Sequence, residues 1–76
     1  MQDMQDMMRR LNQSGKRLSK GHRKIADYIV QHYDKAVFMT ASTLGESVGV
    51  SESTVVRFAG ALGYEGYPQL QRALQE

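Results

Sequence analysis

The side chains best suited to chemistry lie within one seven-residue stretch. Arg57 carries a planar guanidinium that can donate two parallel hydrogen bonds to N7 and O6 of a guanine base. Its neighbour Val56 can contact a thymine methyl group, and nearby hydroxyls can bond phosphate or base edges. These hydroxyls belong to Ser51, Ser53 and Thr54. Short side chains around one arginine predict a surface that approaches a DNA groove. The alternative is an exposed polar face on which Arg57 pairs with an acid such as Glu46.

A second group of charges forms a short basic segment. Five cations and no acid fall between residues 16 and 24, whereas residues 36–76 carry two cations and four acids. The cations are Lys16, Arg17, Lys20, Arg23 and Lys24. A net charge of +2 alone is weak support for nucleic-acid binding, but the clustering predicts that Lys20, Arg23 and Lys24 contact phosphates. The alternative is a solvated helix end.

Patterns for catalysis, metals and cofactors are missing from the sequence. It has no cysteine, which excludes disulfides and thiolate zinc sites. His22 and His32 lack a carboxylate partner at ligand spacing, and no serine belongs to a pattern that predicts a triad. The glycine-containing run at 63–67 lacks the Lys-Ser/Thr of a phosphate-binding loop. We therefore expect no enzyme, metal or cofactor.

The elements that position Arg57 are predicted to be helices, because no stretch alternates apolar and polar residues as a strand does. We expect five or six helices and no sheet. The segments are about 2–13, a helix that starts after Ser19, a short turn at 33–37, 41–48, 52–62, and a last helix that begins near Pro68. Ser19, Thr40 and Ser51 are the expected N-caps, and Gly63 is expected to end the fifth segment.

Residues 41–60 have the pattern of a helix-turn-helix. Two short helices flank Gly49, which is suited to a turn with positive φ. Gly45 supplies the small residue needed where two backbones cross closely. The predicted core between the helices consists of Leu44, Val48, Val50, Val55, Phe58 and Leu62. If the apolar stripe of the second helix, residues 52–62, is buried, Arg57 on the opposite face points outward. Residues 52–62 are therefore the predicted recognition helix.

Three further groups complete the expected packing. Met1, Met4, Met8 and Leu11 form an apolar stripe on the first helix, which either closes the core or contacts a second copy. Val37, Phe38 and Met39 are expected to enter the core. Tyr64 follows the recognition helix and is either a packing anchor or a hydroxyl that reaches a phosphate.

Two longer stretches resemble the N-terminal domain of the RpiR family of bacterial regulators. They are GHRKIADYIV at 21–30 and LGESVGVSESTVVRFAGALGYEGYPQLQRAL at 44–74. The resemblance covers about residues 18–74. It implies a compact, homeodomain-like helical bundle whose recognition helix enters the major groove. Two departures from the family are Gly21-His22, where acids and small polar residues are more usual, and Gly60-Ala61, which leave the end of the recognition helix bare. Gly45 departs from the general helix-turn-helix pattern, in which alanine is commoner at this position.

The resemblance also implies the setting of such a domain. Family members repress or activate genes of sugar metabolism, and a C-terminal sugar-isomerase-like domain binds a phosphosugar effector and dimerises. Residues 1–76 are then one DNA-binding domain, the N-terminal part of a longer homo-oligomeric regulator that binds a double-stranded operator. The N-terminus resembles no secretory signal, and the longest apolar run is Ala36–Met39, so we expect a cytoplasmic protein with no membrane contact. The alternative function is a helix-turn-helix used for contacts with another protein.

Overall fold

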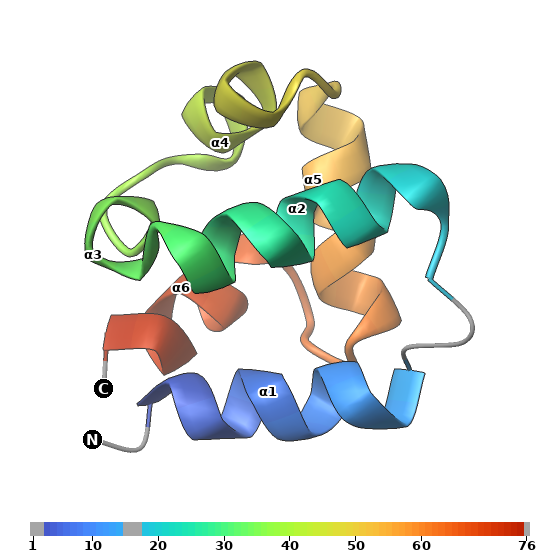
Figure 1. Ribbon diagram of the computed structural model, residues 1–76, viewed down its shortest axis with the longest axis vertical. Coiled ribbons are helices and arrows are strands. Elements are labelled where there is room, and N and C mark those ends of the chain that lie inside the picture. The colour runs from blue at the N-terminus through green and yellow to red at the C-terminus, as the bar shows by residue number, and fades with distance from the viewer. Residues whose placement is uncertain (1–2, 15–17, 76) are drawn as a thin grey trace.

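The computed structural model describes residues 3–14 and 18–75, and Figure 1 shows their arrangement. The described chain forms six helices and contains no strand, which confirms the all-helical prediction. The helices are α1 (Asp3–Ser14), α2 (Lys20–Gln31), α3 (Tyr33–Ala36), α4 (Ala41–Val48), α5 (Glu52–Ala61) and α6 (Tyr67–Gln75). In Figure 1, α1 runs along one edge, and α6 lies beside its first half.

The starts of α2, α4 and α5 are set by local hydrogen bonds. The side-chain oxygens of Ser19, Thr40 and Ser51 each accept a hydrogen bond from the backbone N–H three residues later, at 3.2, 3.1 and 3.1 Å. Each bond satisfies one of the donors that a helix leaves unpaired at its N-terminus. All three predicted N-caps are therefore confirmed.

Two glycines with positive φ determine where α4 and α5 stop. Gly49 has a φ of 90° and Gly63 a φ of 96°, in the left-handed region that side chains with a Cβ atom disfavour. The N–H groups of Gly49 and Val50 both donate to the carbonyl of Gly45, at 2.7 and 2.9 Å. The predicted turn between α4 and α5 is thus confirmed, and its short span holds the two helices at a fixed angle.

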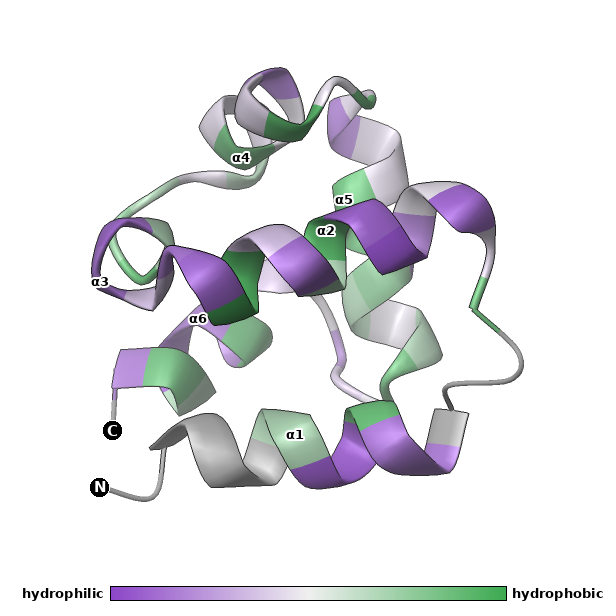
Figure 2. Ribbon diagram, in the orientation of Figure 1, coloured by the Kyte–Doolittle hydropathy of each residue, from purple (hydrophilic) through white to green (hydrophobic). Residues whose placement is uncertain are grey.

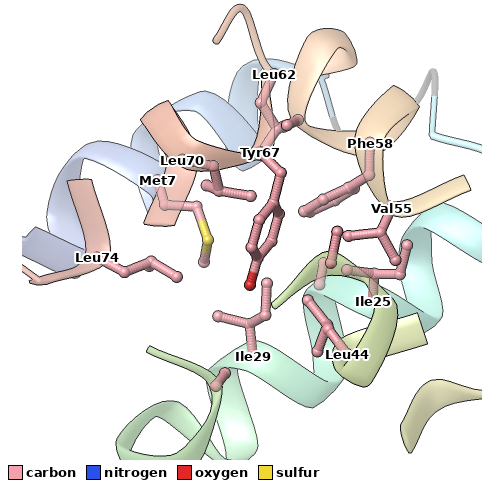
Figure 3. Close-up of a cluster of buried hydrophobic side chains, with 14 of the residues drawn as sticks. Met7, Ile25, Ile29, Leu44, Val55, Phe58, Leu62, Tyr67, Leu70 and Leu74 are labelled. Atoms are coloured by element: carbon pink, nitrogen blue, oxygen red, sulfur yellow. The ribbon is translucent and has the colours of Figure 1, made fainter. Parts of the chain in front are cut away.

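The core is formed where all six helices meet, and its side chains are shown in Figure 3. Of the six residues predicted to share a core, Leu44, Val55, Phe58 and Leu62 are buried, whereas Val48 and Val50 are half-buried and pack against it. The remaining large, fully buried side chains are Met7, Ile25, Ile29, Leu70 and Leu74. Figure 2 shows hydrophobic and hydrophilic residues interleaved along α2, as expected for a helix with one buried face.

The predicted apolar stripe of α1 is wrong in its register. Met7, which the stripe omitted, is fully buried, whereas Met8 is 36% exposed. Leu11 is half-buried, one turn after Met7, so α1 packs against α6 through the row that contains these two residues. Met1 and the side chain of Met4 lie outside the described residues. Four methionines lie among the first eight residues of the chain, so α1 offers several equivalent stripes, and only the packing partner selects one.

Phe38 was also predicted wrongly, because its side chain is 78% exposed instead of buried. The carbonyls on either side of it, from Val37 and Met39, accept hydrogen bonds from the Gln71 amide at 3.2 and 2.9 Å. The Tyr67 hydroxyl also donates to the Met39 carbonyl, at 2.7 Å, and burial raises the pKa of this hydroxyl to about 12, so it remains a donor. These bonds anchor the backbone to α6 while the phenyl ring points into solvent.

Candidate nucleic-acid interface

The outward face of α5 carries the side chains that the sequence singled out. Val55, Phe58 and Ala59 are buried on the opposite face, and this leaves Arg57, Ser53 and Val56 exposed, with Val56 at 43%. Successive residues of an α-helix are about 100° apart, so the exposed residues form one continuous strip. The core itself therefore determines that this strip faces away from the protein.

The hydroxyls around α5 differ in how they are engaged. The Ser51 hydroxyl accepts from the Thr54 backbone N–H and lies 2.9 Å from the Thr54 side-chain oxygen. Ser53 is exposed, and its side chain makes no hydrogen bond to another described residue. Ser51 and Thr54 consequently act first as a helix cap, and Ser53 retains its full hydrogen-bonding capacity for a ligand.

Arg57 is available for recognition. It is exposed on the strip, and among the described residues no acid and no hydrogen-bond acceptor pairs with its guanidinium. The alternative that Arg57 is held by Glu46 is therefore not seen in the structure. An unpaired guanidinium on a surface of short side chains can offer its two-pronged donor to a planar acceptor such as a guanine edge.

Close packing of the two helix N-termini adds α2 to this surface. A Cβ atom on Gly21 would lie 3.5 Å from the Thr54 methyl group and 3.7 Å from a Val50 methyl group. The first turn of α2 thus lies directly beside the first turn of α5. Lys20, the exposed first residue of α2, directly precedes Gly21 in the turn that packs on α5.

His22 is a residue of this site that the sequence reasoning did not select. Its imidazole packs edge-on against Phe58, with ring centroids 5.7 Å apart at 72°. Burial, and then the charge of Arg57, lower the pKa of His22 below its ordinary value. The signal that would have found it is spacing: His22 lies three and seven residues before Ile25 and Ile29, on the buried stripe of α2.

The other members of the basic segment are dispersed. Arg23 lies about 200° around α2 from Gly21, and it lines a groove between α1 and α2 on the side of α2 away from α5. Lys24 lies in a shallow hollow between α2 and α4, with Ser47 and Val48. Lys16 and Arg17 lie outside the described residues. Of the basic segment, Lys20 is therefore the residue best placed to contact a DNA phosphate while α5 contacts the same duplex. Phosphate contacts by Arg23 and Lys24 stay predictions.

Tyr64 lies at the far end of α5, where it anchors α1. The guanidinium of Arg10 lies 4.2 Å from the centroid of the half-buried Tyr64 ring and donates a hydrogen bond of 3.0 Å to the Leu62 carbonyl. Arg10 thus binds the carbonyl of the C-cap residue of α5 while it stacks on Tyr64. These contacts favour the packing role of Tyr64, and its reach to a phosphate stays a prediction.

The described part of the chain offers neither a membrane span nor a metal cluster. No helix there is long and apolar enough to cross a membrane. No three histidine or acidic side chains gather there in a way that could hold a metal ion.

Comparison with known proteins places this arrangement in a family. Residues 5–76 match the helix-turn-helix domain of the rpiR family. Over 67 residues the chain is 40% identical to the uncharacterized HTH-type transcriptional regulator YfhH of Escherichia coli strain K12, a match that covers 88% of this chain and 24% of the relative. Over 73 residues it is 32% identical to the HTH-type transcriptional regulator HexR of Pseudomonas aeruginosa, covering 96% of this chain and 26% of the relative.

The chain spans about a quarter of the length of the curated relatives it matches. No solved structure matches it.

Proposed function

Because the chain belongs to the rpiR family of helix-turn-helix domains, in which matching proteins are transcriptional regulators, we propose that it binds one DNA sequence through α5 in the major groove. The observation that carries this proposal is the outward strip of α5, where an unpaired Arg57 stands among short side chains. Arg57 reads a guanine in this proposal. Val56 contacts a thymine methyl group, and Ser53 bonds a base edge or a phosphate.

The remaining contacts in the proposal position the domain on the duplex. Lys20 neutralises a phosphate beside the start of α5, and Ser51 and Thr54 offer the hydrogen-bonding capacity that their cap leaves over. Phosphate contacts carry little sequence information, so their role is general affinity and register. Lys24, Arg23 and Tyr64 lie farther from the strip and are secondary candidates.

The wider role rests on the family resemblance and on the length of the relatives. We propose that residues 1–76 are one domain, the N-terminal part of a longer cytoplasmic regulator of sugar or phosphosugar metabolism genes. A phosphosugar would act on it through a C-terminal sugar-isomerase-like domain, and the regulator would be a homo-oligomer on its operator. The family resemblance is compatible with repression and with activation.

The experiment that tests DNA reading uses Arg57 and a matched control. Bound sequences are selected from random duplex DNA, and affinities for the selected and random duplexes are then measured by fluorescence anisotropy. Arg57→Ala should weaken binding to the selected sequence by about 1–3 kcal/mol, and much less on random DNA. Arg57→Lys should restore little, because an ammonium cannot copy the two-pronged donor. Arg72→Ala removes an exposed arginine from α6 and should leave both affinities unchanged.

Other outcomes would redirect the proposal. If Arg57→Ala loses equal affinity for selected and random duplexes, Arg57 contacts a phosphate instead of a base. If its affinity is unchanged, Ser53 and Val56 are the residues that recognise the bases. If the wild-type chain selected no sequence and bound no duplex, the helix-turn-helix would serve another purpose, such as contact with a protein.

A further inference from the structure

The groove between α1 and α2 is an apolar surface that the DNA-binding role does not use. It has a volume of about 380 Å³. Its apolar lining comes from Met8 and Leu11 of α1, from Leu18, and from Ala26 and Val30 of α2. Met8 is 36% exposed and Val30 is 40% exposed, which makes them two of the few large hydrophobic side chains exposed in the described chain. Exposed apolar residues that gather in one groove indicate a contact surface.

We propose that this groove binds a second copy of the same chain, and that two domains pair through it across a two-fold axis. The inference rests on the proposed function, because a helix-turn-helix with one reading helix gains affinity and specificity when two copies bind two half-sites. In such a pair, Met8 and Val30 of each copy would be buried against the apolar groove of the other.

The charges along the groove fit a copy of itself. Arg23 and Asp27 both line it, four residues apart on the same face of α2. If two α2 helices run antiparallel across a two-fold axis, Arg23 of each copy lies opposite Asp27 of the other. A surface that pairs with itself must be self-complementary in this way, and opposite charges one turn apart on a helix satisfy that condition.

The position of the groove leaves the DNA-binding strip open. Gly21 marks the side of α2 that contacts α5, whereas Val30 lies nine residues further on, about 180° around the helix. The molecule measures 28 × 27 × 23 Å, so the centres of two copies in contact lie about one such width apart. Because α5 lies on the far side of α2 from the groove, the two recognition helices lie further apart than the centres. This is compatible with the spacing of about 34–36 Å between successive major grooves.

The first test measures self-association without DNA. Sedimentation equilibrium of the wild-type chain over a concentration series should show a reversible dimer. Val30→Asp places a charge in the groove and should weaken the dimer at least about tenfold, which corresponds to about 1.4 kcal/mol. Val56→Asp is the matched control, because Val56 is as exposed as Val30, at 43%, and lies on α5. Its dimer should be unchanged. A wild-type chain that stays monomeric at ~1 mM, or an equal loss in both variants, would overturn the proposal.

The second test exchanges charges. Arg23→Asp and Asp27→Arg should each weaken self-association, because each creates like charges across the axis. An equimolar mixture of the two variants should form a heterodimer tighter than either homodimer, since every facing pair is then of opposite sign. Melting curves of each variant show whether it remains folded. A mixture that associates no better than its components would contradict the antiparallel arrangement of α2.

The third test separates this inference from the proposed function. Affinity is measured on a duplex with one selected half-site and on a palindrome of two. Val30→Asp should keep the wild-type affinity for the single half-site and lose the gain in affinity on the palindrome. If the wild type binds neither duplex, the DNA-binding proposal fails while the sedimentation result still stands. If it binds both equally well, pairing through the groove is refuted while DNA binding is retained.

Discussion

A methyl group on Gly45 would lie 2.8 Å from the backbone carbonyl oxygen of Val50, closer than Cβ atoms approach other atoms in proteins. The contact joins α4 to the turn that precedes α5, and both partners are held by backbone geometry. No side chain can rotate away to make room. The absence of a Cβ at this position therefore sets how closely α4 approaches the turn, and with it the orientation of α5.

The same substitution should have opposite effects at two glycines of this motif. Gly45→Ala should lower the free energy of unfolding by about 1–3 kcal/mol, because the turn must shift to admit the methyl group. Gly60→Ala should raise it by about 0.5–1 kcal/mol, because nothing lies within 4 Å of the new atom and alanine favours the helix. Urea denaturation of the two variants checks both signs. A Gly45→Ala variant as stable as wild type would show that the Val50 turn relaxes at no cost.

Arg10 should contribute to stability through its contacts at the end of α5. Arg10→Met keeps an unbranched side chain but removes the donor to the Leu62 carbonyl and the charge above Tyr64, and should cost about 1–2 kcal/mol. The adjacent Arg9 is exposed, so Arg9→Met serves as the control and should cost much less. The comparison is made from urea midpoints at a common slope. Equal losses would mean that the arginine acts through net charge alone.

His22 should make stability dependent on pH. Burial beside Phe58, and then the charge of Arg57, lower its pKa in the folded protein, so the neutral imidazole is favoured there. Protonation therefore favours the unfolded chain. The contribution to stability is present above the unfolded pKa of about 6.5 and is lost as pH falls through the lowered folded pKa. Unfolding free energies measured across this window should decline toward acid pH.

Two variants separate His22 from the other titrating groups in that experiment. His22→Gln should flatten the decline just below pH 6.5, since a neutral amide replaces the imidazole. His32→Gln removes the other histidine and should leave most of the decline in place. If the decline disappears in His32→Gln and persists in His22→Gln, the pH dependence arises from His32 and the prediction for His22 is wrong.

The salt dependence of DNA affinity should distinguish Lys20 from Arg23. On a single half-site, Lys20→Gln should flatten the slope of log K against log salt by about 0.9, the value for one lost phosphate contact. Arg23→Gln should leave this slope unchanged, because its side chain lines the groove on the far side of α2 from α5. Affinities measured at four or more salt concentrations give the slopes. If both variants flatten it, Arg23 also reaches the DNA, as the basic segment alone predicted.

Local features of this protein could be read from its sequence, because the groups that make them are neighbours in the chain. The caps at Ser19, Thr40 and Ser51 need only a hydroxyl and an N–H three residues away. The turn needs Gly49 at its positive φ. Once Val55 and Phe58 are recognised as a buried stripe, helical geometry alone turns Arg57 outward. Sequence therefore determined the helix-turn-helix and the candidate reading face of α5.

Only the tertiary structure decided the features that join distant segments. Met7 is buried instead of Met8 because α6 selects one of several possible stripes on α1. Phe38 is exposed because Gln71 and Gln75, more than thirty residues later, hold the backbone carbonyls on either side of it. The contact of Arg10 with Tyr64 likewise joins segments that are far apart in sequence. Periodicity shows that a helix has a buried face, but which residue at its edge is covered depends on the shape of the partner that packs there.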